Sequence, residues 1–240
     1  GRGKGPLLTG KNALDIVRDA GFTAWFPVQA GVSEWMGDVK VRRRHECLIT
    51  QEQIAEMAGR LEPGDILLER REWYLSNIGL PGFWPHAALY VGTPAIRRAC
   101  FDDEATRDWV RRQGRADGDF EALLRARHPA TYDASLAPLE DGHAPQVIEA
   151  MSEGVVFTTL EHSAEADSVA VLRPRLDRKD KAAALLRAFG YVGRPYDFDF
   201  DFLTDSALVC TEVVYKAYQP APGQSGLNLP LVKVMGRAVT

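Results

Sequence analysis

The chain has 240 residues, of which 45% are hydrophobic and 26% are charged, as is ordinary for a soluble globular protein. Its formal net charge of -4 gives no general attraction to nucleic acid or to an anionic membrane surface. Since no apolar run approaches the roughly 20 residues that a membrane-spanning helix needs, we expect a soluble protein with no nucleic-acid partner and no membrane segment.

The first 60 residues predict a helical N-terminal extension. Apolar residues recur at helical spacing from Asn12 to Ala20. Thr50 then precedes a second predicted helix, from Gln51 to Arg60, and Gln53 stands three residues after Thr50 as in a capping box.

From Asp65 onward the apolar runs become short and strand-like, and turn residues bound most of them. The predicted strands are Ile66–Leu68, Ala87–Val91, Val147–Ile148, Val155–Phe157 and Val169–Leu172. An insertion between the second and third strands, about residues 93–142, has helical pattern, and two later helices are predicted over Lys179–Ala188 and Leu208–Tyr218. Strands clustered between helices, without regular β–α alternation, predict an α+β fold with an extension over 1–60 and a main domain over 61–240.

Three cysteines, Cys47, Cys100 and Cys210, are too few and too scattered for a disulfide scaffold, and none has zinc-knuckle spacing. The count suits a reducing compartment and so favours the cytoplasm, although one disulfide beside a free thiol stays open. Because the chain begins with Gly1 rather than methionine, we expect a piece of a longer or processed protein.

Cys210 has the sequence setting of a reactive thiol. Asp205 or Ser206 can cap a helix whose first turn contains Cys210. The N-terminus of a helix lowers the pKa of a thiol and offers free backbone N–H groups. The alternative is a small buried cysteine on an amphipathic helix, which is a common structural role. Cys47 and Cys100 lack such a setting, and we interpret both as structural.

His86 and Glu149 are candidates for a base and its partner. His86 opens a predicted strand, where an imidazole can project from the sheet toward a helix terminus; a satisfied core or surface histidine is the alternative. Glu149 lies among apolar neighbours on the next strand, so it needs a partner if it faces inward. Orienting an imidazole would supply that partner, and an outward-facing, solvated side chain is the alternative.

Common cofactor motifs are missing from the sequence. It has no phosphate-binding loop, dinucleotide fingerprint, zinc-protease motif, EF-hand loop or serine nucleophile elbow. The acidic run Asp197–Asp201 alternates with phenylalanine, which we interpret as an edge strand or loop rather than a cation site. We therefore predict neither a metal nor an organic cofactor.

Several blocks, in their order along the chain, resemble the circularly permuted papain-like amidases, the YiiX-like branch of the NlpC-type cysteine hydrolase superfamily. The blocks are Leu61–Ile66, Pro85–Gly92, Val147–Ala150, Gly154–Val155, Pro195–Phe198 and Val209–Tyr218. In unpermuted relatives the cysteine helix precedes the histidine strand, whereas here the histidine comes first. The resemblance implies a small antiparallel sheet or barrel packed against the cysteine-bearing helix.

The resemblance further implies that Cys210 is the nucleophile, His86 its base and Glu149 the residue that orients His86, in a catalytic domain spanning 61–240. The expected reaction is hydrolysis of an amide bond in a peptide, isopeptide or cell-wall-type peptide, through a thioester. One alternative is an acyltransferase or a lipid or ester deacylase of the lecithin:retinol acyltransferase type, acting on an acylated substrate, because the aromatic stretch Trp73–Trp84 could line an acyl pocket. A second alternative is an inactive binding module. The 1–60 extension and the 93–142 insertion depart from the family pattern, and both could shape or cover the cleft.

Overall fold

The computed structural model describes residues 47–72, 83–139, 142–195, 209–229, 232–234 and 237–239. Three features discussed above therefore lie outside the described residues. They are the predicted helix at Asn12–Ala20, the acidic run Asp197–Asp201 and most of the aromatic stretch, of which Phe83 and Trp84 are described.

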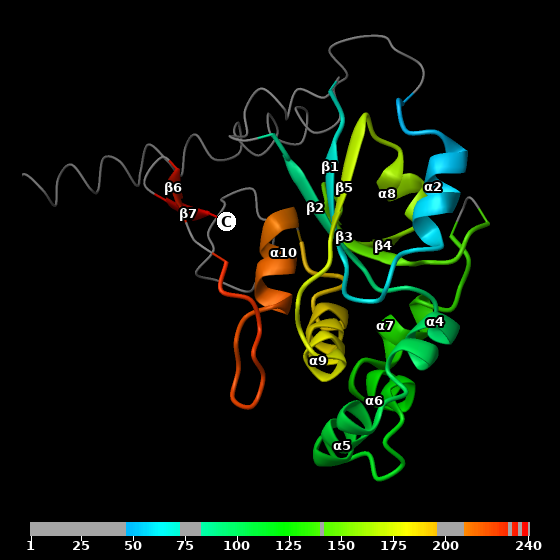
Figure 1. The fold of residues 1–240 in the computed structure, drawn as a ribbon, viewed down its shortest axis with the longest axis vertical. Coiled ribbons are helices and arrows are strands. Elements are labelled where there is room, and N and C mark those ends of the chain that lie inside the picture. The colour runs from blue at the N-terminus through cyan, green and yellow to red at the C-terminus, as the bar shows by residue number, and fades with distance from the viewer. Residues whose placement is uncertain are drawn as a thin grey trace, which may run out of the picture.

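A five-stranded antiparallel sheet forms the centre of the fold, in the order β4-β3-β2-β1-β5 (Figure 1). The strands are β1 (Ile66–Arg70), β2 (His86–Tyr90), β3 (Val147–Met151), β4 (Gly154–Thr158) and β5 (Ser168–Leu172). All five predicted strands are present and the α+β class is confirmed. The sheet is open rather than closed into a barrel, with β4 and β5 at its edges. Near the C-terminus, β6 (Val232–Val234) and β7 (Arg237–Val239) form a separate pair.

Helices cover both faces of the sheet, because successive residues of each strand project to opposite sides. On one face, Leu67, Ala88 and Tyr90 pack in a cluster that includes residues of α2 (Gln51–Ala58) and α8 (Leu160–Ala164). On the other, Ile66 and Leu89 pack in a cluster that includes residues of α9 (Arg178–Phe189) and α10 (Cys210–Ala217). Figure 1 shows these two pairs of helices on opposite sides of the strands.

The helix α2 confirms the predicted N-terminal cap. The backbone N–H of Gln53 donates to Thr50 Oγ1 at 3.3 Å, and the backbone N–H of Thr50 donates to Gln53 Oε1 at 2.9 Å. Two backbone N–H groups at this end of the helix are thus satisfied reciprocally. The helix ends at Ala58, slightly before the predicted end at Arg60.

The insertion between β2 and β3 forms four helices, α4 (Pro94–Cys100), α5 (Glu104–Arg112), α6 (Phe120–Arg127) and α7 (Pro129–Ala134). A buried ion pair joins its first and third helices, since Arg97 Nε lies 2.7 Å from Glu121 Oε1. Arg97 Nη1 also donates to the carbonyl of Gly92 at 2.7 Å, just after β2. The insertion packs against α9 and lies at the end of the sheet remote from the start of β2 (Figure 1). Its described part is thus away from His86, which corrects our expectation that the insertion could cover the cleft.

The cysteine-bearing helix α10 is fixed at its C-terminal end by Tyr218. The phenol of Tyr218 is buried and donates a hydrogen bond to the carbonyl of Gly64, just before β1. Gly64 has a positive φ of 97°, and a Cβ at this position would lie 2.8 Å from the Tyr218 oxygen. Because other residues disfavour this backbone region and lack the space, glycine is required here. The contact ties the last part of the fold to its first strand.

Candidate active site

Cys210 is the first residue of α10, preceded by Val209 as the N-cap. The backbone N–H of Val209 donates to Glu212 Oε2 at 3.3 Å, so a carboxylate from within the first turn satisfies this end of the helix. We predicted Asp205 or Ser206 as the cap, and this is wrong because the helix begins at Cys210 itself. The placement of Cys210 in the first turn is as expected.

The thiol of Cys210 has surroundings that favour the thiolate. Its Sγ lies 3.7 Å from the carbonyl oxygen of Pro85, and the residue is 7% exposed. Burial alone would raise the pKa of this thiol, but the charge and hydrogen bond of His86 lower it below its ordinary value. Backbone N–H groups of Ala87 and Thr211 act in the same direction. The thiol of Cys210 is therefore buried, yet hydrogen-bond donors around it stabilise the thiolate.

His86 lies between Cys210 and Glu149. Its Nε2 is 2.5 Å from Glu149 Oε2, which leaves Nδ1 as the ring nitrogen that can exchange a proton with the thiol. Burial would lower the pKa of His86, but Cys210 and Glu149 together raise it well above its ordinary value. The imidazolium is thus stabilised between two groups that favour a positive charge.

The carboxylate of Glu149 faces inward and is 0% exposed. It accepts hydrogen bonds from His86 and from the hydroxyl of Thr158 on the neighbouring strand. Burial would raise the pKa of Glu149, but these bonds and the charge of His86 lower it to about 2. Glu149 is therefore ionised at neutral pH, and the hydrogen bond to His86 that we expected from the sequence is present.

The strand pairing explains how one imidazole reaches both partners. His86 is the first residue of β2, and by alternation it shares a sheet face with Ala88 and Tyr90 on the side of α8. Cys210 approaches from the opposite side, where α10 packs against β2 and β3. Because His86 stands at the end of the strand, its ring can contact Glu149 on its own face of the sheet. Beyond the end of β2 the same ring also reaches the N-terminus of α10 on the other side. The three residues thus converge at one end of the sheet.

A family model described as permuted papain-like amidase enzyme, YaeF/YiiX, C92 family, matches residues 60–240. The chain belongs to this family. Family C92 consists of cysteine peptidases and amidases, so the protein is a papain-like cysteine amidase, which confirms the resemblance and the predicted enzyme class. Comparisons with curated proteins and with solved structures give no match.

The match to the C92 family begins next to the boundary that we place between residues 60 and 61, and the division into extension and catalytic domain stays a prediction. Within the described part of this papain-like amidase, no helix is long and apolar enough to cross a membrane.

The other cysteines of this C92 amidase lie outside the group around His86. Neither Cys100 nor Cys210 is joined in a disulfide, so the disulfide left open by the sequence is not formed. Burial raises the pKa of Cys100, which favours the inert thiol. Cys47 is half-buried in the segment before α2.

Sequence reasoning missed Glu69, a second buried carboxyl group beside His86 in this papain-like site. Glu69 is 1% exposed, and it is paired directly opposite His86 in the register of β1 and β2. Ser163 on α8 donates a hydrogen bond to its Oε1, and Arg71 Nη2 lies 3.6 Å from its Oε2. The available signal was the same as for Glu149, since Glu69 follows the apolar run Ile66–Leu68.

Glu69, His86 and Glu149 each offer a ligand atom, and these atoms lie within 4.8 Å of one another. Two features oppose a resident cation at this point of the amidase. The Nε2 of His86 is occupied by its hydrogen bond to Glu149, and the guanidinium of Arg71 already brings a positive charge to Glu69. The group is therefore better described as a hydrogen-bonded network of charges than as a metal centre.

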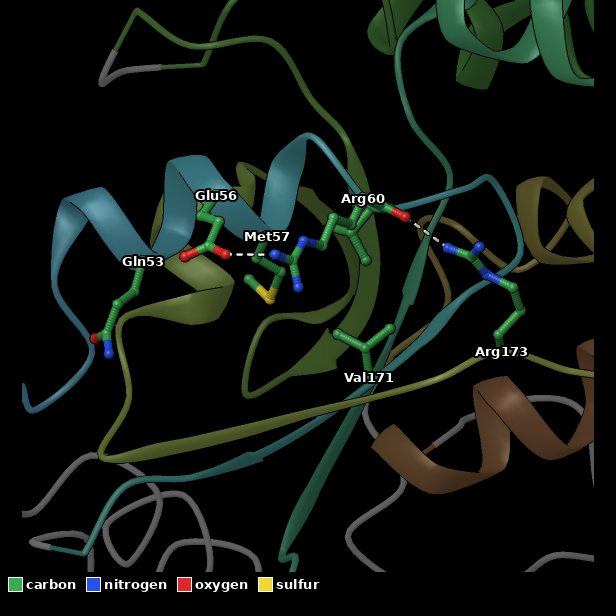
Figure 2. A pocket seen from close by; sticks show the side chains of 7 residues that line it. Gln53, Glu56, Met57, Arg60, Val171 and Arg173 are labelled. Atoms are coloured by element: carbon green, nitrogen blue, oxygen red, sulfur yellow. Dashed lines mark hydrogen bonds and ion pairs between the residues drawn. The ribbon is translucent and has the colours of Figure 1, made fainter.

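A hollow of about 510 Å³ lies elsewhere in the C92 amidase, between α2 and the region of edge strand β5 (Figure 2). Figure 2 shows that Arg60, which lines the hollow, forms an ion pair with Glu56. Arg173 donates a hydrogen bond to the carbonyl of Arg60. Three polar residues of the hollow are thus linked to one another, and none of its lining residues belongs to the Cys210 group.

Proposed function

We propose that the protein hydrolyses an amide bond of a peptide, isopeptide or cell-wall-type peptide, with Cys210 as nucleophile, His86 as base and Glu149 as the residue that orients His86. The observation that carries this proposal is the contact chain itself, in which Cys210 opens α10 beside His86 and Nε2 of His86 lies 2.5 Å from Glu149 Oε2. The pKa shifts agree with it, since the pKa is lowered for Cys210, raised for His86 and lowered for Glu149. A base that is stabilised as a cation between a thiol and a carboxylate is suited to hold a thiolate–imidazolium pair.

In the proposed mechanism, the proton of the Cys210 thiol passes to Nδ1 of His86. The thiolate attacks the amide carbonyl carbon, forming an S–C bond while the carbonyl electron pair moves to oxygen. In this mechanism, backbone N–H groups in the first turn of α10 donate to the oxyanion; the N–H of Thr211, which bonds the Cys210 sulfur in the resting state, is one of them. The C–N bond then breaks, and the leaving amine takes the proton from His86, which leaves a thioester.

Water completes the proposed reaction. His86, now neutral, accepts a proton from the attacking water while its Nε2 stays bonded to Glu149. The second tetrahedral intermediate collapses with cleavage of the S–C bond, and the thiolate of Cys210 returns beside the imidazolium. Throughout the cycle Glu149 keeps its negative charge, because its pKa of about 2 is far below that of His86.

One observation keeps acyl transfer or deacylation as a second candidate. Phe83 is 57% exposed and packs edge to face against Trp84, two residues before His86. Exposed aromatic surface next to the base is suited to an acyl chain as well as to an apolar peptide side chain. The inactive-module alternative is disfavoured by the family and by the shifts at Cys210.

The test combines thiol mapping with a substrate panel. Iodoacetamide at about pH 6 should modify Cys210 ahead of Cys47 and Cys100, because only a thiolate reacts rapidly at that pH. Peptides, isopeptides and acyl esters are then offered to wild type, to Cys210→Ala and, as a matched control, to Cys100→Ala. Cleavage of amides that is lost only in Cys210→Ala supports the proposal. Full activity in Cys210→Ala would refute it, and cleavage of esters alone would favour the acyl alternative.

A further inference from the structure

Glu69 has no role in the mechanism above, although it is buried within the same network. We propose that Glu69 is a positioning residue that supplies His86 with a second, titratable counter-charge behind Glu149. The inference rests on the proposed roles of Cys210 and His86, and it adds a residue that makes the stability of their ion pair depend on pH.

The geometry places Glu69 where its charge must act on His86. The two residues are direct partners in the β1–β2 register, and one polar atom of each lies within 4.8 Å of the other and of a carboxylate oxygen of Glu149. Side chains directly opposite on antiparallel strands are neighbours on one face of the sheet. Both carboxyl groups are buried, so water screens their charges little.

The surroundings hold Glu69 in place while leaving it able to titrate. Oε1 accepts a hydrogen bond from Ser163, whereas Oε2 is buried and has no hydrogen-bond partner, with Arg71 at 3.6 Å. Arg71 is in turn held by backbone carbonyls of α8 and the segment after it. The groups that face Glu69 are His86 from β2, Glu149 from β3, Arg71 after β1, Ser163 from α8 and its other pairing partner Val169 from β5.

The two carboxyl groups ionise in different pH ranges. Burial and the nearby charge of Glu149 raise the pKa of Glu69 to about 7, while His86 and Arg71 act in the other direction. Glu149 is ionised over the same range. Glu69 is therefore neutral in acid and becomes an anion as the pH rises past neutrality. This new charge lies close to His86, and it therefore favours the imidazolium over the neutral ring as the pH rises.

The substitution Glu69→Gln separates this role from a structural one. Glutamine imitates the protonated carboxyl group and can still accept the hydrogen bond of Ser163. The assay measures the rate of Cys210 alkylation by iodoacetate as a function of pH, with the modified residue identified by mass mapping. The rate rises along an acid limb as the thiolate forms. It falls along an alkaline limb as the imidazolium, which attracts this anionic reagent, loses its proton. We expect Glu69→Gln to leave the acid limb in place and to move the alkaline limb down by about one pH unit or more.

The control is Glu153→Gln, an exposed carboxylate in the turn between β3 and β4, which makes the same change of charge and should leave both limbs unchanged. Ser163→Ala is a second variant: loss of the hydroxyl donor delays ionisation of Glu69, so the alkaline limb should move down by less. Unchanged limbs in folded Glu69→Gln, or equal movement of both limbs, overturn the inference. Absence of preferential Cys210 alkylation in the wild type instead overturns the proposed function.

Discussion

Glu149→Gln is the substitution that most directly tests whether an ionised carboxylate holds His86. The carboxylate is fully buried and accepts hydrogen bonds from both His86 and Thr158. Glutamine keeps the shape, and its amide oxygen can accept one of these bonds, but the negative charge is lost. We therefore expect a folded protein of lower stability, whose deficit depends on pH.

The two pKa shifts define the pH window. The pKa of Glu149 is lowered from 4.5 to about 2, so its stabilisation is present above about pH 4.5 and is lost as the pH falls toward 2. The pKa of His86 is raised well above 6.5, so its stabilisation is present below about pH 6.5 and is lost as the pH rises through the raised value. Glu149→Gln should therefore lower the free energy of unfolding most between about pH 4.5 and about pH 6.5, where both stabilising effects are fully present. A hydrogen bond between charged groups is worth about 1.5–3 kcal/mol, and we expect a loss of that size.

Urea unfolding of wild type, Glu149→Gln and the exposed control Glu153→Gln measures this loss at about pH 3.5 and 5.5. The difference between wild type and Glu149→Gln should be larger at the higher pH, while the control follows wild type at both. Turnover of Glu149→Gln should fall about 10- to 100-fold, because the imidazolium loses its partner. A difference that is absent, or that does not vary with pH, refutes an ionised Glu149–His86 pair.

Three further predictions follow from other contacts. Cys210→Ala and His86→Ala should each lower turnover by at least about 10³-fold, while urea unfolding shows a loss of only about 1 kcal/mol for Cys210→Ala. Arg97→Met should lower the free energy of unfolding by about 3–5 kcal/mol because it leaves Glu121 as an unpaired buried charge; the double variant with Glu121→Leu should recover most of it. Gly64→Ala should cost about 2 kcal/mol or more in the same assay, because of its positive φ and the close contact at its Cβ position.

The elements that the sequence predicted well are those with a local cause. Each of the five strands is a short apolar run bounded by turn residues, and the pattern needs no knowledge of distant partners. The N-terminus of α2 follows from two side chains three residues apart, Thr50 and Gln53. The inward position of Glu149 was implied by the family resemblance, whereas the local pattern also allowed an outward-facing, solvated side chain.

The elements that the sequence did not predict depend on contacts between distant segments. Glu69 is placed opposite His86 by the strand register, which no local pattern fixes. The start of α10 at Cys210 was missed because its first N–H group is satisfied by Glu212 from inside the helix rather than by a preceding polar residue. The sequence left open that the insertion could shape or cover the cleft, because no local pattern shows where an insertion after the histidine strand lies. In space it follows the far end of that strand, since β2 runs from His86 away from the site.

Because of the permuted order, Cys210 is held beside His86 by contacts between distant parts of the chain, and one of these is the hydrogen bond of Tyr218. The strand that carries His86 lies early in the sequence, whereas the helix that carries Cys210 lies late in it. The hydrogen bond from Tyr218 to the carbonyl of Gly64 joins the C-terminal end of α10 to the segment just before β1. A shift of α10 along its axis would change the distance between Cys210 and His86 directly. Gly64→Ala, which forces Tyr218 to move, should therefore lower turnover per folded molecule as well as stability.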